Sequence, residues 1–321
     1  MNRRTINIYI IIIGVALASA CSRTDIDGNA GTIRFTPVVA KATKAIITGT
    51  TYPTSESFMI SAYYGGTATY FSDLAATYSS AIDYWTTSVS QYWPLAGSLT
   101  FHAFSPSDAS GASLSSGGLS VTDYTIQNNT QMTTDLCYAT ATVADCASHP
   151  DYVPLTFSHA LSQVVFRVKA ADYYSTGSNT VSLTMTSLAL GGIYSVADYS
   201  GGAWDNHESE HSYSLSSSST ALTYGAGNVP DTIDVCSFLF LPQELGPNAS
   251  ITVGYSITQT ISGQADSFSN APVTIHLGGT IDEWEPGKKY IYTLSIGMDN
   301  LITFTASALG WLEQEGGLVV E

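Results

Sequence analysis

The chain has 321 residues, of which 44% are hydrophobic and only 11% are charged. This length is enough for two domains of about 150 residues each. The formal net charge is −16, and the imbalance is greatest beyond Lys44, where four basic residues stand against 24 acidic ones. So negative a surface repels phosphate groups, which excludes charge-driven binding to nucleic acid and to acidic lipid head groups.

The N-terminus has the parts of an export signal. Arg3 and Arg4 form a positive region, residues 6–17 are apolar, and residues 18–20 read Ala-Ser-Ala before Cys21. The apolar run has about the length of a secretory signal and is too short for a comfortable membrane span. A small residue before a cysteine at this point is typical of bacterial lipoproteins, so we predict a signal peptide at 1–20 and a lipid on Cys21. The alternative is an ordinary cleaved signal followed by an incidental cysteine.

Residues 21–44 are predicted to be a tether followed by a β-arm. Residues 22–31 are polar, and beyond them Ile33, Phe35 and Val39 alternate with polar residues, which is the period of a strand with one buried face. Pro37 must lie where the ladder needs no N–H group.

Basic residues are concentrated in this arm. It holds Arg23, Arg34, Lys41 and Lys44, whereas the next 122 positions hold no basic residue. A trypsin-like protease could therefore remove the arm and leave the following segment whole. The alternative is that these residues meet anionic head groups near the lipid anchor.

The rest of the chain is a succession of short extended runs between turn-forming residues, such as residues 58–64 and 99–104. No segment shows a sustained helical period, and residues 72–80 are at most a short helix. The strand pattern restarts at residue 155, where we place the boundary between an N-terminal domain (45–154) and a C-terminal domain (155–321). The pattern predicts an all-β chain with mainly antiparallel strands.

Three cysteines remain beyond the lipidation site. Cys137 and Cys146 are nine residues apart in an exported chain, which allows a local disulfide. The alternative is that both, together with Cys236, are buried free thiols.

Two patterns resemble catalytic motifs, and both fail on their surroundings. Residues 207–211 read His-Glu-Ser-Glu-His, the zinc-peptidase pattern, which requires a helix to place His207 and His211 on one face. Glycines precede it and a serine run follows, so we expect an exposed polar loop. The carboxylates of Asp282, Glu283 and Glu285 precede a turn with lysines and are expected to be solvated. His159 is expected to be hydrogen-bonded near a strand start. We predict no enzyme, no metal and no cofactor.

Four aromatic residues lie close together in the sequence, namely Tyr84, Trp85, Tyr92 and Trp93. Aromatic side chains on a sheet face suit carbohydrate binding, although the same residues serve more often in core packing. The alternative to a structural role is therefore a monomeric surface lipoprotein that binds a glycan or a peptide.

Several segments resemble the fimbrillin family of Bacteroidales. Besides the lipoprotein signal, they are residues 42–45 before 50–52, LTFHAFSP at 99–106, VPLTFSHALSQV at 153–164, WEPGKKYIYTL at 284–294, and ITFTAS at 302–307 with Trp311. The resemblance spans nearly the whole chain. It implies two tandem transthyretin-like β-sandwich domains of Greek-key topology, and a non-enzymatic subunit of a type V pilus at the cell outer membrane.

The resemblance also implies a mechanism. In that family a trypsin-like protease removes the N-terminal arm of a lipoprotein precursor, and a strand from another subunit enters the vacated groove. On this chain the groove-filling positions are Ile33, Phe35 and Val39. The expected partners are other fimbrial subunits in a homo- or heteropolymer, the outer membrane through the Cys21 lipid, and a host or bacterial surface ligand.

The same mechanism places the cut after Lys44, with Lys41 and Arg34 as alternatives. The terminal segment 316–321 would be either a donor strand or a last core strand. Stalk, tip and anchor positions in the pilus all remain open.

Overall fold

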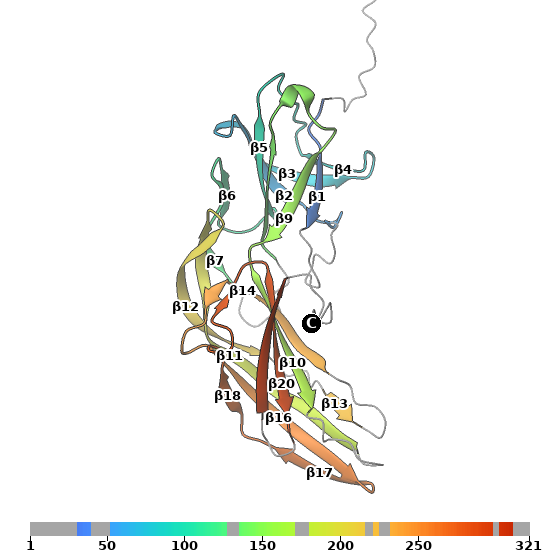
Figure 1. The fold of residues 1–321 in the computed structure, drawn as a ribbon. Coiled ribbons are helices and arrows are strands. Elements are labelled where there is room, and N and C mark those ends of the chain that lie inside the picture. Colours follow the sequence, from blue (N-terminus) through green and yellow to red (C-terminus); the bar gives the residue numbers. More distant parts are fainter. Residues whose placement is uncertain are drawn as a thin grey trace, which may run out of the picture.

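The computed structural model describes residues 31–39, 52–126, 135–170, 180–215, 221–224, 232–297 and 302–310. Their regular structure is β-strand, apart from one 3₁₀ turn, η1 (Cys146–Ser148). The all-β prediction is confirmed. A barrel forms the upper part of the molecule in Figure 1, and larger sheets form the lower part.

The barrel is closed, and its strands are rich in aromatic residues whose side chains point inward. Phe35, Phe58, Phe101 and Phe157, each on a different strand, are all fully buried. In order around the barrel the strands are β1 (Phe35–Val39), β4 (Tyr84–Thr87), β3 (Ala68–Ser79), β2 (Phe58–Tyr64), β5 (Leu99–Ser105), β8 (Cys137–Val143) and β9 (Val153–His159).

The remaining strands form three sheets. The four-stranded sheet has the order β14 (Ile233–Phe240), β10 (Ser162–Ala170), β20 (Lys288–Ile296), β21 (Ile302–Gly310). The eight-stranded sheet has the order β17 (Gln264–Ser269), β16 (Ser250–Ile261), β11 (Thr180–Ser200), β7 (Gly118–Thr125), β6 (Ala112–Ser115), with β12 (Ala203–Leu215) and β13 (Ala221–Tyr224) on β11 and β18 (Val273–His276) on β16. A short ribbon pairs β15 (Gln243–Glu244) with β19 (Glu283–Trp284).

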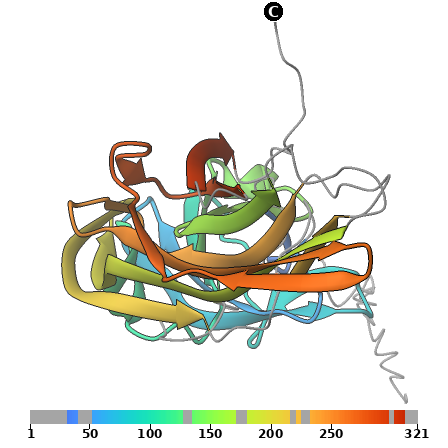
Figure 2. The same ribbon diagram turned by 90° about the horizontal axis from the view of Figure 1, so that it is seen from below.

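The two larger sheets lie one over the other, as Figures 1 and 2 both show. Aromatic side chains from the two sheets meet between them. The ring of Tyr213 on β12 is 5.1 Å from that of Phe240 on β14, which in turn stacks on Trp284 at 5.2 Å. Burying such rings removes much apolar area from water, which stabilises the layered arrangement.

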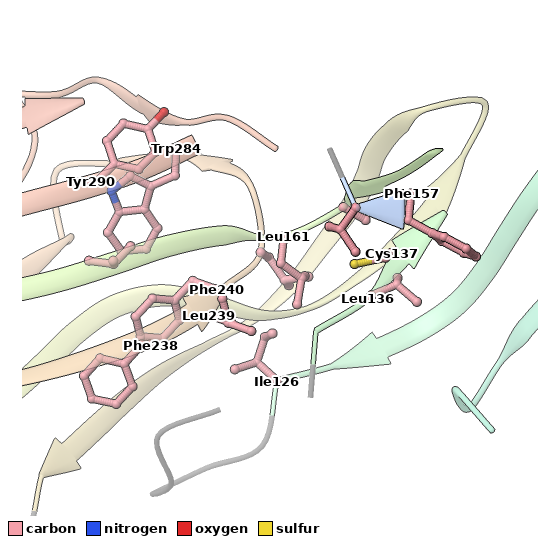
Figure 3. Packing of buried hydrophobic residues seen from close by; sticks show 14 of the residues in the cluster. Ile126, Leu136, Cys137, Phe157, Leu161, Phe238, Leu239, Phe240, Trp284 and Tyr290 are labelled. Carbon is pink, nitrogen blue, oxygen red and sulfur yellow. The ribbon is translucent and has the colours of Figure 1, made fainter. Parts of the chain in front are cut away.

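The barrel and the lower sheets share one hydrophobic core. Figure 3 shows Leu136 and Phe157 on the barrel side and Leu161, Leu239 and Phe240 on the lower side of one buried cluster. All five residues are at most 1% exposed.

The connection from β9 of the barrel to β10 of the four-stranded sheet is only two residues long and is bonded on both sides. Ala160 N–H donates to the Leu136 carbonyl at 2.8 Å, and the Ala160 carbonyl accepts from the Trp204 indole at 2.6 Å. The Leu161 carbonyl accepts from the Gly287 N–H at 2.9 Å. The connection therefore has the bonding of a core segment.

Two sequence expectations are corrected here. Residues 72–80, expected to be at most a short helix, lie mostly in β3, because pairing with β2 and β4 outweighs the helix preference of their alanines. The strand run expected from residue 155 onward is two strands in different sheets, β9 and β10, and the expected boundary after residue 154 falls inside β9.

Strands β6 and β7 also depart from a simple division of the chain. Both come from the first half of the sequence, yet β7 pairs with β11 in the eight-stranded sheet, for example at Val121–Tyr199. Sequence periodicity predicts such strands without indicating their partners, because pairing is decided by tertiary contacts.

Candidate functional site

Strand β1 closes the barrel between β4 and β9, and we call the space between these two neighbours the β1 groove. The strand is parallel to β9 in a continuous register from Phe35–Val153 to Val39–Phe157. It pairs with β4 only at Phe35–Trp85. Parallel strands cannot be joined by a tight hairpin, so no short connection ties β1 to β9. The position of β1 therefore depends on its contacts within the groove.

One face of β1 fills this groove. Ile33, Phe35 and Val39 are 1%, 0% and 2% exposed, while Val38 on the opposite face is 40% exposed. Pro37 is buried on the inner face as well. The alternation predicted from the sequence is therefore present, with one more inward position than we expected.

The hydrogen bonds explain why a proline is tolerated in β1. The Arg34 carbonyl accepts from the Val153 N–H at 2.7 Å, so in a parallel ladder the even-numbered residues of β1 direct their backbone groups to β9. Pro37 consequently directs its nitrogen towards β4, beyond the single paired residue Phe35. No ladder bond is lost there.

Phe35 lies at the centre of an aromatic cluster. Its ring is 6.0 Å from that of Phe58 and 5.8 Å from that of Phe101, both in edge-to-face geometry. Phe157 on β9 packs against Phe58 at 5.4 Å. Side chains from two other barrel strands, β2 and β5, therefore line the position that Phe35 occupies, and Phe157 extends the cluster through Phe58.

The residues just before β1 are bonded to a different segment. The Ile33 N–H donates to the Gln91 carbonyl at 2.8 Å, and the Trp93 N–H donates to the Gly31 carbonyl at 3.0 Å. The Arg34 guanidinium lies 5.7 Å from the ring centre of Tyr84, a cation–π distance. The bonded part of the arm thus begins before β1 itself.

Other residues of the predicted apparatus lie outside the described residues. These are the lipidation residue Cys21, the cleavage residues Lys41 and Lys44, and the terminal segment 316–321.

A buried polar cluster links the ends of β8 and β9. His159 Nδ1 makes a short hydrogen bond to Asp135, and the Cys137 thiol lies 3.5 Å from both partners. All three side chains are buried. His159 is hydrogen-bonded as expected, at the end of its strand rather than near the start. Nothing in the sequence pairs it with Asp135, because a complete strand separates the two residues along the chain.

The cluster has ligand atoms within 4.8 Å of one another, as a metal site would. Burial raises the pKa of the Cys137 thiol well above its usual value, with the Asp135 carboxylate adding to the effect. The three side chains form a hydrogen-bond network that ties the start of β8 to the end of β9.

The zinc-peptidase pattern lies in strand β12 rather than in the exposed loop that we expected. Gly201 and Gly202, with φ of 60° and 91°, form the hairpin turn that sends these residues back along β11. Four residues along a strand span about 13 Å, whereas a zinc ion needs both imidazole nitrogens about 2 Å away. His207 Nε2 instead donates to the Pro242 carbonyl at 2.7 Å.

The aromatic residues considered for glycan binding do not form one platform. Trp85 and Trp93 are 7% and 9% exposed, and Trp93 stacks on His149 at 4.7 Å. Tyr92, by contrast, is 58% exposed. Both tryptophans therefore belong to the core, and the structure does not support glycan binding through them.

The remaining candidates from the sequence are the acidic residues before the lysine turn and the three cysteines. Lys288 Nζ lies 2.5 Å from Glu285, the local lysine partner expected for that turn. Cys137, Cys146 and Cys236 are buried free thiols, so of the two alternatives the disulfide is the wrong one. Among the described residues, no helix is long and apolar enough to cross a membrane.

Comparisons with solved structures find proteins of similar fold. A search of curated proteins finds no match. A crystal structure of a fimbrial protein from Bacteroides vulgatus ATCC 8482 has a TM-score of 0.59 and 19% identity, covering 87% of this chain and 99% of that chain. A structure from Bacteroides ovatus ATCC 8483, described provisionally as a cell adhesion protein, has a TM-score of 0.52 and 14% identity, covering 88% and 99%. At these identities the likeness shows the fold alone.

The sequence itself matches a family model. The model of fimbrillin-like proteins matches residues 43–311, which is most of the chain and includes the barrel strands after β1 and the lower sheets. This protein therefore belongs to the fimbrillin-like family.

Proposed function

We propose that this protein is a structural or adhesive subunit of a cell-surface fimbria, exported as a lipoprotein through Cys21 and assembled by strand exchange. The arm is cut after Lys44 or Lys41, β1 leaves its groove, and a strand of another subunit replaces it. The partners are other fimbrial subunits, and the outer membrane holds the precursor. The protein has no enzymatic role in this proposal.

The observation that carries the proposal is the position of β1. It is a short strand between two others, and its departure would leave the edges of β4 and β9 unpaired. It would also empty the aromatic pocket around Phe35. An unpaired edge beside an apolar groove accepts an extended segment, with backbone bonds for affinity and side-chain pockets for specificity.

The buried side chains of the arm determine how strongly it is bound in the β1 groove. Burying Ile33, Phe35 and Val39 contributes about 1.5–3 kcal/mol each. An intact arm therefore blocks the groove firmly, and a donor strand must present apolar side chains at the same alternate positions to replace it.

The position of β1 also ranks the three cleavage candidates. A cut after Arg34 would leave Phe35–Val39 attached to the body and still in the groove. A cut after Lys41 or Lys44 would separate the whole of β1 from the barrel. We therefore place the productive cut at one of the two lysines.

Two transthyretin-like domains are part of the same proposal. The boundary between them is best placed at residues 160–161, because β9 belongs to the barrel and β10 to the four-stranded sheet. The shared core at this connection supports a fixed orientation of the two.

The experiment uses the secreted precursor carrying Cys21→Ser, which removes the lipid. We expect it to be monomeric by light scattering until limited trypsin treatment, and then to form oligomers. Mass spectrometry should find a new N-terminus at Ala45 or Ala42. Persistent monomers after clean removal of residues 21–44 would contradict strand exchange.

A peptide of residues 31–39 provides the matched control. Added to cleaved protein, it should occupy the β1 groove and prevent oligomers from forming. A peptide with Val38→Ala should act equally well, because Val38 faces outward. A peptide with Phe35→Ala should bind at least about 100-fold more weakly, since it leaves the aromatic pocket empty.

A further inference from the structure

Exposed apolar side chains gather at one end of the barrel. They are Tyr64 at the end of β2, Tyr70 in β3, and Tyr92 and Leu95 in the segment 88–98 that joins β4 to β5. Leu95 is 95% exposed and Tyr92 is 58% exposed. We call these four side chains the apolar tip. An exposed apolar patch of this kind marks a surface that contacts a partner or a membrane.

Contacts within the barrel hold these side chains on one surface. The Tyr70 hydroxyl donates to the Tyr92 carbonyl at 2.7 Å. The ring of Tyr64 lies directly against Gly97, since a Cβ added to this glycine would come within 2.2 Å of the tyrosine oxygen. Leu95 lies between Tyr92 and Gly97 in the same segment. Three separate pieces of chain therefore form a single surface.

This surface is uncharged, although the protein is strongly negative. Residues 64–70 and 88–98 contain no charged residue, whereas the whole chain has a formal net charge of −16. The adjoining turn η1 is bonded to the segment through the Cys146 N–H and the Gly97 carbonyl, and it brings one carboxylate, Asp145, which accepts from the Ala147 N–H at 3.0 Å. Uncharged tyrosine and leucine side chains suit the interface of a bilayer, where tyrosine is enriched.

The arm enters the barrel beside the apolar tip. Thr32 forms a β-bridge with Tyr92, and the Trp93 N–H donates to the Gly31 carbonyl at 3.0 Å. In Figure 1 β1 begins at the upper end of the barrel, away from the lower sheets. The segment that carries Tyr92 and Leu95 is therefore bonded to the first described residues of the arm.

The length of chain before Gly31 fixes how far the tip can lie from a lipid on Cys21. Ten residues separate the two positions, and ten residues span at most about 36 Å when fully extended. A short connection of this kind gives the tip an effective concentration in the millimolar range at the bilayer. A contact too weak to bind free protein to a membrane is then sufficient to orient an anchored one.

We propose that the apolar tip rests in the interface of the bilayer that holds the Cys21 lipid. Leu95 enters the acyl boundary, and the tyrosine hydroxyls stay among the head groups. The barrel then faces the membrane, and the lower sheets point away from it. The contact is apolar and needs no anionic lipid. This inference rests on the lipid of the proposed function, and removal of the arm would release the tip together with its anchor.

The experiment couples the chain of residues 21–321 through Cys21 to a maleimide lipid in phosphatidylcholine vesicles. The other three cysteines are buried, so coupling is expected at Cys21. Leu95→Trp places a reporter at the tip, and its fluorescence is the difference from the parent chain. We expect brominated acyl chains to quench this fluorescence at least about twofold, because the tip reaches the acyl boundary. Unquenched fluorescence would overturn the proposal.

A matched control carries the reporter at the other end of the molecule. Phe268 is also an exposed apolar side chain, at 54%, but it lies on β17 at the lower end of Figure 1. Phe268→Trp should therefore remain unquenched. Equal quenching of the two reporters would show that the anchored protein has no preferred orientation, which would also overturn the proposal.

A charge in the tip tests the apolar nature of the contact. Adding Tyr92→Asp to Leu95→Trp should abolish the quenching, because a carboxylate is costly to place in the acyl region. The melting temperature of the free protein should stay the same, since the Tyr92 side chain is exposed. Quenching that persists in this variant would contradict an apolar contact at the tip.

Other coverings of the tip give different results. If residues of the same chain cover it, Leu95→Trp will show the blue-shifted emission of a buried indole without vesicles. If a second copy covers it, light scattering of the Cys21→Ser chain will show a dimer that Leu95→Asp abolishes. Either result would overturn the proposal. We expect a monomer and the emission of a solvent-exposed indole.

The chemical anchor separates this inference from the proposed function. It occupies the position of the natural lipid whether or not the cell attaches one, so quenching tests the tip alone. The mass of the N-terminus of protein from cells tests lipidation. An unquenched tip beside a lipidated Cys21 would overturn this inference and leave the proposed function standing. An unlipidated N-terminus would overturn the anchor, and with it the bilayer as the partner.

Discussion

Strands β1 and β10 occupy corresponding places in the two parts of the molecule. Each lies between one antiparallel and one parallel neighbour, and these are the two parallel pairings among the described strands. The difference is in their bonding. β10 pairs with β14 from Ser162–Phe240 to Val168–Ile233 and with β20 from Gln163–Lys289 to Ala170–Ile296. β1 is paired along β9 and at a single position on β4.

The proposed strand exchange depends on this difference, because β10 would stay in place while β1 is replaced. Removing β10 would break ladders on both its edges and the bonded connection at residues 160–161. Removing β1 breaks one ladder and empties one groove. The same arrangement of neighbours is therefore paired along both edges in β10 and along only one edge in β1.

The largest expected effect comes from placing a carboxylate on each strand. Phe166→Asp puts a charge into a fully buried site of β10 and should prevent folding of the lower sheets. Phe35→Asp should expel β1 and leave the lower sheets folded. Hydrogen exchange followed by mass spectrometry distinguishes the two, and loss of protection throughout the chain in Phe35→Asp would contradict the comparison.

A milder change measures the hold on β1 directly. Phe35→Ala should lower the free energy of unfolding by about 3–5 kcal/mol, because it opens a cavity among Phe58 and Phe101. Val38→Ala, on the outer face, should change it by at most about 0.5 kcal/mol. Urea denaturation of both variants checks this, and equal effects would show that β1 is not held by its inner face.

Disrupting the polar cluster of Asp135, Cys137 and His159 should lower the free energy of unfolding by less than the largest core substitutions do. Asp135→Ala removes the acceptor of His159 and of the Cys137 thiol inside the core, and should cost about 3 kcal/mol. Asp135→Asn keeps one acceptor oxygen and should cost less. If both variants unfold at the wild-type urea concentration, the cluster does not stabilise the junction.

Thiol reactivity offers a local test of the same comparison. All three described cysteines are buried, and burial raises the pKa of Cys236 to about 12. In the precursor none should react with a disulfide reagent at neutral pH. After removal of the arm, Cys137 in the barrel should become reactive while Cys236, beside β10, stays protected. Equal protection of both would show that the barrel keeps its packing without β1.

The smallest expected effect is on pH dependence. The pKa of His102 is lowered from 6.5 in the folded protein, so its neutral ring stabilises the fold fully above that pH. Stability should then fall as the pH drops below 6.5, because the unfolded chain takes up a proton that the folded chain does not. In His102→Gln the loss between about pH 7.5 and about pH 5 should be smaller. An unchanged pH dependence would show that His102 is not involved.

Much of the fold was predictable because it depends on local pattern. The all-β class follows from short runs of aromatic and β-branched residues between turn formers. The buried face of β1 follows from alternation at Ile33, Phe35 and Val39. The pairing of distant residues was beyond that pattern, since neither the Asp135–His159 contact nor the pairing of β7 with β11 has a local signature.

The sequence alone predicted the arm, with an expected export signal, its basic residues and its strand period, because each of these is a pattern of adjacent residues. Only the tertiary structure decided where that strand lies: parallel to β9, paired at one position with β4, and centred on the Phe35 pocket. The physical reason is that side-chain period specifies which face of a strand is buried. The pairing partner of a strand, its direction and the strength of its packing are set by groups far away along the chain.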